Sequence, residues 1–208
     1  MIYVILTVSL YATSVTNTDI YKNRVSNYVT SIAHTLSILH PLILNDKIKV
    51  IIVEGNGLRD TVLEMFRTNI LYTNNNETKY RRYGRNELMD IKSVIDTYKI
   101  NDDDLVIKIS GRYKLLSLYA FEKILKNPDY EAYINLNDTN PNEIKHPDSC
   151  SLALFGMRAK FWSAFNYTDE NSYCEHELCR YVKQLNYFEI EKLYVACYDQ
   201  YGSLFNVV

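Results

Sequence analysis

Residues 104–115 read DLVIKISGRYKL, an apolar run that ends in a glycine turn. The run Leu105–Ile109 predicts a buried strand, because strands covered on both faces are near-continuous apolar segments. Lys108 interrupts the run, and a cation inside a sheet is costly unless it is paired or touches an anionic ligand. The turn Ser110–Tyr113 follows and carries Arg112, whose guanidinium is well placed there to hold a phosphate in bidentate fashion.

Short apolar runs alternate with longer segments of helical periodicity along the rest of the chain. Besides the run quoted above, the predicted strands are 3–8, 47–53, 70–73, 130–136, 152–156 and 193–198. The predicted helices are 20–39, 58–69, 86–98, 115–125, 158–165 and 173–185. This alternation predicts an α/β sandwich in which helices flank a mostly parallel central sheet, within a single domain over residues 1–208.

The composition is that of an ordinary globular chain. The sequence has 208 residues, of which 47% are hydrophobic and 23% charged, and this excludes a disordered tail, a collagen-like fibre and a coiled coil. A net charge of -2 argues against nucleic acid as the partner, because general nucleic-acid binders are usually basic. The four cysteines show no CxxC spacing, so we expect reduced thiols rather than a zinc site or a disulfide framework.

The N-terminal segment MIYVILTVSLYA is apolar, but it fits a first strand better than a membrane segment. It has no basic residues before the apolar run, Thr7 and Ser9 interrupt it, and it is too short to span a bilayer. No other segment reaches the length of a transmembrane helix. We therefore expect a protein without a membrane span that works in the cytoplasm.

Residues that follow the predicted strands are the site candidates, because ligands of open α/β sheets bind beyond the carboxyl ends of the strands. These segments are 7–11, 54–57, 73–76, 110–113 and 135–138. Glu54, followed by Gly55-Asn56-Gly57, can accept hydrogen bonds from a nucleobase or a ribose, or equally cap the next helix. The loop 79–87 holds four cations before a helix, which suits either a diphosphate or a solvated surface.

Four segments resemble GT-A-type glycosyltransferases of large DNA viruses and of bacterial surface-glycan clusters, and they occur in the order found in that family. They are GRNELMDIK at 84–92, DLVIKISGRYKL at 104–115, FGMRAKFW at 155–162 and EHELCRY at 175–181. The first strand and the turn at Glu54 also suit the nucleotide-binding half of that family. The resemblance implies a GT-A-like sandwich, with a nucleotide-binding half at about 1–114 and an acceptor half at about 115–208.

The resemblance implies transfer of a sugar from a nucleotide-sugar donor, expected to be a UDP-sugar, to a glycan or glycoprotein acceptor. The donor-binding residues that it implies surround the uridine, the diphosphate or the sugar. They are Val8, Glu54, Arg85, Asn86, Lys108, Ser110, Arg112 and Tyr113. Glu175, which aligns with the family's acid, or Glu177 beside it would be the catalytic carboxylate. Residues two apart in a helix point to different sides, so only one of these two acids can face the cleft. The alternative is that both acids lie on a solvated face of the helix.

The sequence departs from the family at the metal site. Most GT-A enzymes bind Mn²⁺ or Mg²⁺ through a DxD motif that follows a strand, and Ser110–Tyr113 occupies that place here. The acidic cluster Asp102–Asp104 precedes its strand, which predicts a strand-entry turn at the opposite edge of the sheet. Two alternatives stay open: Arg112 with Lys108 neutralises the diphosphate without a metal, or other acids such as Asp138 bind Mn²⁺ or Mg²⁺.

Two other functions remain alternatives. A sugar nucleotidyltransferase is built on a similar sheet, but it normally carries a loop rich in glycine and lysine after the first strand. This chain has Ser9-Leu10-Tyr11 there, which counts against that function. A non-catalytic glycosyltransferase-like module that binds a glycan or a partner would need no metal-binding acids.

The long polar loop 137–149 predicts an acceptor-binding lid.

Overall fold

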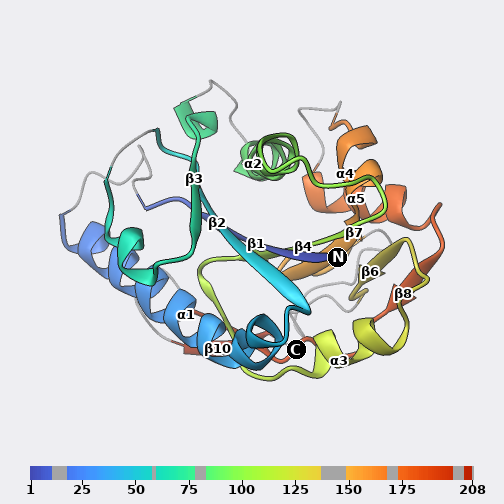
Figure 1. Cartoon of the computed structure of the whole chain (residues 1–208). Helices are drawn as coiled ribbons and strands as arrows, with labels where there is room; N and C mark the ends of the chain where they lie inside the picture. The colour runs from blue at the N-terminus through green and yellow to red at the C-terminus, as the bar shows by residue number, and fades with distance from the viewer. Residues whose placement is uncertain are drawn as a thin grey trace.

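The structure is a computed structural model that describes residues 1–10, 18–57, 60–77, 83–136, 149–167, 173–198 and 204–207. In these residues seven strands form a central sheet in the order β3 (Asn69–Tyr72), β2 (Ile48–Glu54), β1 (Ile2–Val8), β4 (Leu105–Ser110), β7 (Leu154–Arg158), β6 (Ala132–Ile134) and β8 (Tyr187–Glu189). Strand β7 is antiparallel to both of its neighbours, and the other strands all run in one direction. The predicted α/β sandwich with a mostly parallel central sheet is confirmed (Figure 1).

Helices cover both faces of the sheet (Figure 1). One face packs against α1 (Thr18–Leu44), α3 (Tyr119–Lys126) and a small sheet of β10 (Leu204–Val207), β9 (Val195–Tyr198) and β5 (Tyr113–Leu115). The other face packs against α2 (Tyr83–Thr97), α4 (Ala159–Ala164) and α5 (Cys174–Val182). The short 3-10 helices η1 (Val62–Phe66) and η2 (Asn75–Glu77) lie on either side of β3 in the chain. None of the helices in the described segments combines the length and the apolarity that a bilayer span requires.

Successive residues of the central strands point alternately to the two faces. In β4, Ile107 belongs to the core cluster on the α1 side, whereas Val106 belongs to the cluster on the α2 side. In β1, Leu6 and Ile5 divide in the same way. Lys108 follows Val106 by two residues, so its side chain points toward α2 and away from α1.

The predicted helix over residues 58–69 is wrong for the part that the structure describes. Only the 3-10 helix η1 forms there, with Thr61 accepting a hydrogen bond from the Leu63 amide at its start. Arg67 ends it with a left-handed backbone, at a φ of 50°. Val62 and Met65 are exposed, so their helical spacing does not mark a buried face.

The sequence prediction omits β5, β8 and β10, and each of these strands is only three or four residues long. Strand β5 occupies the first position of the helix predicted for 115–125, and α3 begins later, at Tyr119. The prediction also lacks the reversed direction of β7. An apolar run looks the same from the sequence whichever way the strand runs, so hydrophobicity carries no information on direction.

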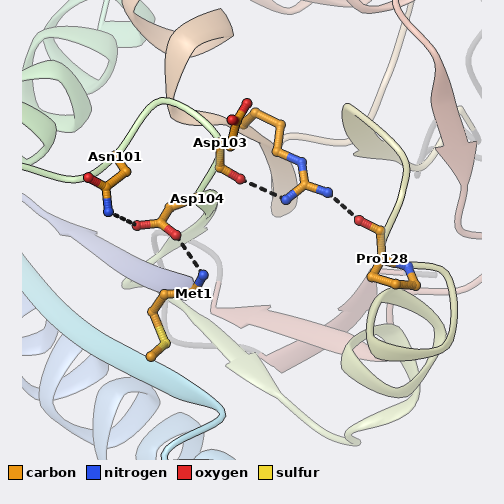
Figure 2. A network of polar contacts seen from close by, with 6 residues as sticks. Met1, Asn101, Asp103, Asp104 and Pro128 are labelled. Carbon is orange, nitrogen blue, oxygen red and sulfur yellow. Dashed lines mark hydrogen bonds and ion pairs between the residues drawn. The ribbon is translucent and has the colours of Figure 1, made fainter.

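The acidic cluster Asp102–Asp104 lies at the amino edge of the sheet, where β4 begins (Figure 2). The Asp104 carboxylate lies 2.6 Å from the Met1 amine and accepts a 3.2 Å hydrogen bond from the Asn101 side chain. Asp103 forms a 2.9 Å ion pair with Lys160. These contacts confirm the predicted strand-entry turn.

Candidate functional site

The carboxyl ends of β1, β2 and β4 lie side by side, as the sequence predicts. Thr7 pairs with Ser110 in the sheet register, and Val8 pairs with Glu54. The Gly111 amide donates a 2.8 Å hydrogen bond to the Thr7 carbonyl. A Cβ atom on Gly111 would lie 2.9 Å from Val8 Cγ2 and 3.0 Å from the Thr7 carbonyl oxygen, so a side chain there would force the turn away from β1. Glycine thus holds the basic turn against the first strand.

Glu54 links the loops that follow β1 and β2. Its side chain is fully buried, at 0% exposure, and one carboxylate oxygen accepts a 3.0 Å hydrogen bond from the Leu10 amide. The other oxygen accepts hydrogen bonds from the amide and the side chain of Asn56. In this arrangement Glu54 fixes the backbone on which a ligand would rest, and a direct contact with a base stays a prediction.

Lys108 has an internal partner. Its ammonium lies 2.9 Å from Glu87 on α2 and donates a 2.7 Å hydrogen bond to the Leu152 carbonyl, and the residue is 4% exposed. The Thr7 hydroxyl donates to the second oxygen of Glu87. Of the two conditions under which a buried cation is tolerated, the structure meets the first, since Lys108 is paired within the chain.

Glu87 and Asp90 are functional candidates that the sequence interpretation missed. Asp90 is 3% exposed and accepts hydrogen bonds from the Thr73 hydroxyl and, at 2.7 Å, from the Asn75 side chain. Burial raises the pKa of Asp90 to about 6, while the hydrogen bonds from Thr73 and Asn75 act in the opposite direction. Through Asp90, helix α2 therefore ties down the loop that follows β3.

The signal that identifies Asp90 is a polar stripe on α2. Asn86, Asp90 and Ser93 recur at the spacing of one helix face. This stripe flanks the apolar residues Leu88 and Ile91, which pack on the sheet. Asn86 is itself buried, and Arg85 is partly exposed.

Arg112 and Tyr113 take different positions after the Gly111 turn. The Arg112 side chain is exposed, and its carbonyl accepts a 3.1 Å hydrogen bond from Ser31 on α1. Tyr113 begins β5 and packs partly buried against the core. Burial, together with Cys197, raises the pKa of Tyr113 to about 12, although Arg112 acts against this rise. Arg112 is therefore the residue of this turn that a ligand can reach most readily.

The segment that enters β7 also reaches this edge, because β7 runs against its neighbours. The Leu152 carbonyl accepts from Lys108, and the Ala153 carbonyl accepts a 3.3 Å hydrogen bond from the Ser110 amide. The Ser151 amide donates a 2.9 Å hydrogen bond to the Asn135 carbonyl at the end of β6. The expectation that only residues following a strand reach the site therefore does not hold for β7.

The first turn of α5 lies against the first turn of α2. A Cβ atom on Gly84 would come within 2.7 Å of Cys174 Cβ. Glu175 and Glu177 are in this turn of α5, Glu175 exposed and Glu177 partly buried. Both predicted acids are thus at the same edge of the sheet as the Lys108–Glu87 pair.

A small cavity lies beneath these two helix starts. Its volume is about 20 Å³, and its lining includes Glu87, Lys108 and Cys174 beside apolar residues of α2, α4 and α5. A cavity of this size has room for about one water molecule. The cavity is therefore too small for a sugar or a nucleotide.

The described residues do not fit a divalent metal of the GT-A type. The turn after β4 offers Ser110, Gly111 and Arg112 in place of two acids. Glu54 and Asp90 are buried and accept hydrogen bonds from neighbouring groups, and Glu87 is bound to Lys108. Within the described residues no group of three or more His, Cys, Asp or Glu side chains is placed to hold a metal ion.

Some predicted features lie outside the described residues. They are the part of the basic loop at 78–82, and residues 137–148 of the predicted lid, which include Asp138. Trp162, in the segment 155–162, is 2% exposed and its indole donates to the Val106 carbonyl, so this aromatic side chain packs in the core.

Comparisons with known proteins give matches in structure. No protein-family model matches the sequence, and no curated protein matches it. A provisionally assigned nucleotide-diphospho-sugar transferase from Desulfovibrio desulfuricans G20 matches 91% of this chain and 79% of its own, with a TM-score of 0.54 and 13% identity. The mannosyltransferase PcManGT from Pyrobaculum calidifontis, solved with GDP-Man and Mn²⁺, matches 92% of this chain at a TM-score of 0.57 and 9% identity.

The chain spans 55% of the length of PcManGT, and it is closer in length to another match. A nucleoside-diphosphate-sugar pyrophosphorylase from Vibrio cholerae RC9 matches 95% of this chain and 95% of its own, with a TM-score of 0.54 and 14% identity. At these identities the likeness concerns the fold. The chain has the GT-A fold, which is similar to that of nucleotide-diphospho-sugar transferases and of a nucleotide-sugar pyrophosphorylase.

Proposed function

We propose that this protein is a glycosyltransferase that moves a sugar from a nucleotide-sugar, a UDP-sugar, to a glycan or glycoprotein acceptor. The observation that carries the proposal is the exposed Arg112 on the Gly111 turn, at the carboxyl end of β4 and beside β1. Ligands of open α/β sheets bind at this edge. A guanidinium there supplies the charge-assisted hydrogen bonds that a diphosphate needs.

The remaining donor-binding residues act around this contact. Glu54 and Val8 hold the loops that would flank the uridine, with Asn86 at the start of α2. Lys108 acts through Glu87, which it positions at the same edge. Ser110 and Tyr113 set the two ends of the basic turn, and Arg85 adds a cation near the start of α2. The nucleotide-binding half at about 1–114 and the acceptor half at about 115–208 belong to the same proposal.

The chemistry requires an acceptor hydroxyl beside the anomeric carbon and a stabilised leaving group. A bond forms from the acceptor oxygen to the anomeric carbon, and the bond from that carbon to the diphosphate breaks. The nucleoside diphosphate leaves with the bonding electrons, and the guanidinium of Arg112 stabilises its negative charge. In an inverting reaction the hydroxyl proton passes to a carboxylate, for which we propose Glu175 first and Glu177 second.

A thermal-shift screen tests donor binding. The protein is melted with UDP, GDP, CMP and UDP-sugars, each with and without Mn²⁺. We expect UDP and UDP-sugars to raise the melting temperature by about 5 to 10 °C at about 100 times the dissociation constant. No shift with any nucleotide would contradict the transferase function and favour the non-catalytic glycan-binding module.

Release of UDP from UDP-sugars in the presence of candidate acceptors tests catalysis. In an inverting enzyme, loss of a general base costs about 100-fold or more in kcat, so we expect Glu175→Gln to have an effect of this size. Glu177→Gln tests the second candidate in the same way, since it removes the other carboxylate from the same helix turn. Equal rates in the wild type and both variants would overturn the assignment of the base.

A sugar nucleotidyltransferase is the second candidate, favoured by the match to the Vibrio cholerae pyrophosphorylase over 95% of both chains. Residues 9–17 read SLYATSVTN and contain neither glycine nor lysine, which counts against it. This candidate predicts formation of a nucleotide-sugar and pyrophosphate from a nucleoside triphosphate and a sugar phosphate.

We propose the cytoplasm as the site of action, of the host cell for a viral protein, because four free cysteines suit a reducing compartment.

A further inference from the structure

Two arginines from distant parts of the chain lie near Tyr28 at the carboxyl edge: Arg24 contacts its hydroxyl, and Arg112 follows Gly111, whose backbone packs against its ring. Arg24 lies one helical turn before Tyr28 on α1, with its guanidinium carbon 5.2 Å from the ring centroid and one nitrogen 3.4 Å from the hydroxyl. Arg112 approaches from the turn after β4. Burial raises the pKa of Tyr28, and the charges of Arg24 and Arg112 both oppose that rise. Arg24 and the turn that carries Arg112 therefore meet at Tyr28.

The surrounding backbone holds the two arginines in place. The Arg24 Nε atom donates a 2.7 Å hydrogen bond to the Ser9 carbonyl, in the loop after β1. Ser31 donates to the Arg112 carbonyl, and the Tyr28 ring packs where a Cβ atom on Gly111 would come within 3.1 Å of it. The Arg24 side chain is anchored in this way and loses less conformational entropy when a ligand binds, while the turn fixes the backbone position of Arg112.

The positive charge of this pair is not neutralised by the part of the chain that the structure describes. There, neither Arg24 nor Arg112 forms an ion pair with a carboxylate. The acids whose charges reach Tyr28 are Glu87 and Glu54. Glu87 is bound to Lys108, and Glu54 accepts hydrogen bonds from the Leu10 amide and from Asn56. Two guanidiniums that pair with no carboxylate of the described residues thus lie at the carboxyl edge, one of them on the turn that would hold a metal in most GT-A enzymes.

We propose that Arg24 and Arg112 together bind the diphosphate of the donor and supply the charge that a divalent cation supplies elsewhere, so that donor binding needs no metal. The inference rests on the proposed function. Two monovalent cations carry the charge of one divalent ion, and each guanidinium matches two phosphate oxygens in a planar fork.

Titration calorimetry with UDP tests the metal requirement. The wild-type protein is titrated in buffer with EDTA and again with Mn²⁺. We expect the dissociation constant of UDP to agree within about twofold between the two conditions. Binding that appears only with Mn²⁺ would overturn the inference and leave the proposed function standing. Absence of UDP binding in both conditions would overturn both.

Charge-removing variants test the two arginines. We expect Arg24→Gln and Arg112→Gln each to weaken UDP binding by about 10-fold or more, because a hydrogen bond to a charged group is worth about 1.5 to 3 kcal/mol. Lys126→Gln is the matched control, since it removes one exposed positive charge at the end of α3, before β6 begins. Melting temperatures of all variants verify that they fold.

Uridine distinguishes a phosphate contact from a disturbed site. We expect uridine, which has no phosphate, to bind the wild type and the two arginine variants with equal affinity, measured by competition with UDP. An equal loss of uridine and UDP affinity would mean that the substitutions deform the site, and it would overturn the assigned role. Full UDP affinity in Arg24→Gln together with a loss in Arg112→Gln would overturn the paired arrangement.

Discussion

The two edges of the central sheet differ in how their charged residues are paired. At the amino edge, Asp104 pairs with the Met1 amine (Figure 2), and Asp103 pairs with Lys160. The guanidinium of Arg158 donates there to the carbonyls of Asp103 and Pro128. At the carboxyl edge, Arg24 and Arg112 form no ion pair within the described residues. Charges paired within the chain contribute to folding, whereas we propose that the two arginines at the other edge bind a ligand.

The Lys108–Glu87 pair sharpens this comparison, because it lies at the carboxyl edge and is nevertheless closed within the chain. The pair lies at the edge where ligands bind, but both of its charges are neutralised within the chain, as they are in the ion pairs of the amino edge. Substitutions of Lys108 or Glu87 change the stability of the fold without removing Arg24 or Arg112. Their effects therefore separate the contribution of this edge to stability from its contribution to ligand binding.

The largest effect on stability is expected for Lys108→Met. It removes the partner of Glu87 and leaves a carboxylate against the sheet, so we expect a loss of about 3 kcal/mol in the free energy of unfolding. Urea denaturation measures this value. A stability equal to that of the wild type would mean that the pair contributes nothing to the fold, and the comparison of the two edges would fail.

A smaller, pH-dependent effect is expected from Asp90. Its pKa is about 6 in the folded chain, above the ordinary value of 3.8, so the folded state binds the proton more tightly than the unfolded state does. The stabilisation is complete only below the ordinary pKa of 3.8 and is lost as the pH rises through about 6, and the part lost between pH 4 and pH 7 is about 2 kcal/mol.

Asp90→Asn removes this titration and keeps an acceptor for Thr73 and Asn75. Unfolding free energies of the wild type and Asp90→Asn at pH 4, 5, 6 and 7 check the prediction. We expect the wild type to lose stability relative to the variant across this range. A constant difference at all four values would show that Asp90 does not titrate there.

The smallest effect is expected for Lys160→Ala at the amino edge. Its ion pair with Asp103 is largely in water, and exposed pairs contribute little to stability. We expect no measurable change in urea denaturation, and none in UDP affinity. This variant is the control for Lys108→Met, since both remove one lysine from an ion pair with a distance of 2.9 Å.

Much of the fold is readable from the sequence because buried strands are apolar runs. Leu105–Ser110 and Ile48–Glu54 are predicted within one residue at each end, and the amino-edge position of Asp102–Asp104 follows from strand length alone. The helix at 58–69 fails because Val62 and Met65 imitate an amphipathic face while remaining exposed. Periodicity records spacing, and spacing alone does not show that a face is buried.

The candidate site is readable only in part, because the prediction searched residues that follow strands. That search finds Glu54 and Arg112. It misses Arg24 and Glu87, which reach the same edge from helices α1 and α2. The signal available in the sequence is a polar or charged residue one turn from another on the same helix, such as Arg24 and Tyr28.

The antiparallel direction of β7 has a consequence for how this edge can change over time. The segment before β7 meets its neighbours through the carbonyls of Leu152 and Ala153 and the amide of Ser151. Every residue type has a main-chain carbonyl, and all except proline have an amide proton. Side chains of this segment can therefore be replaced while these contacts persist, so the chain can keep its path while its amino acids diverge.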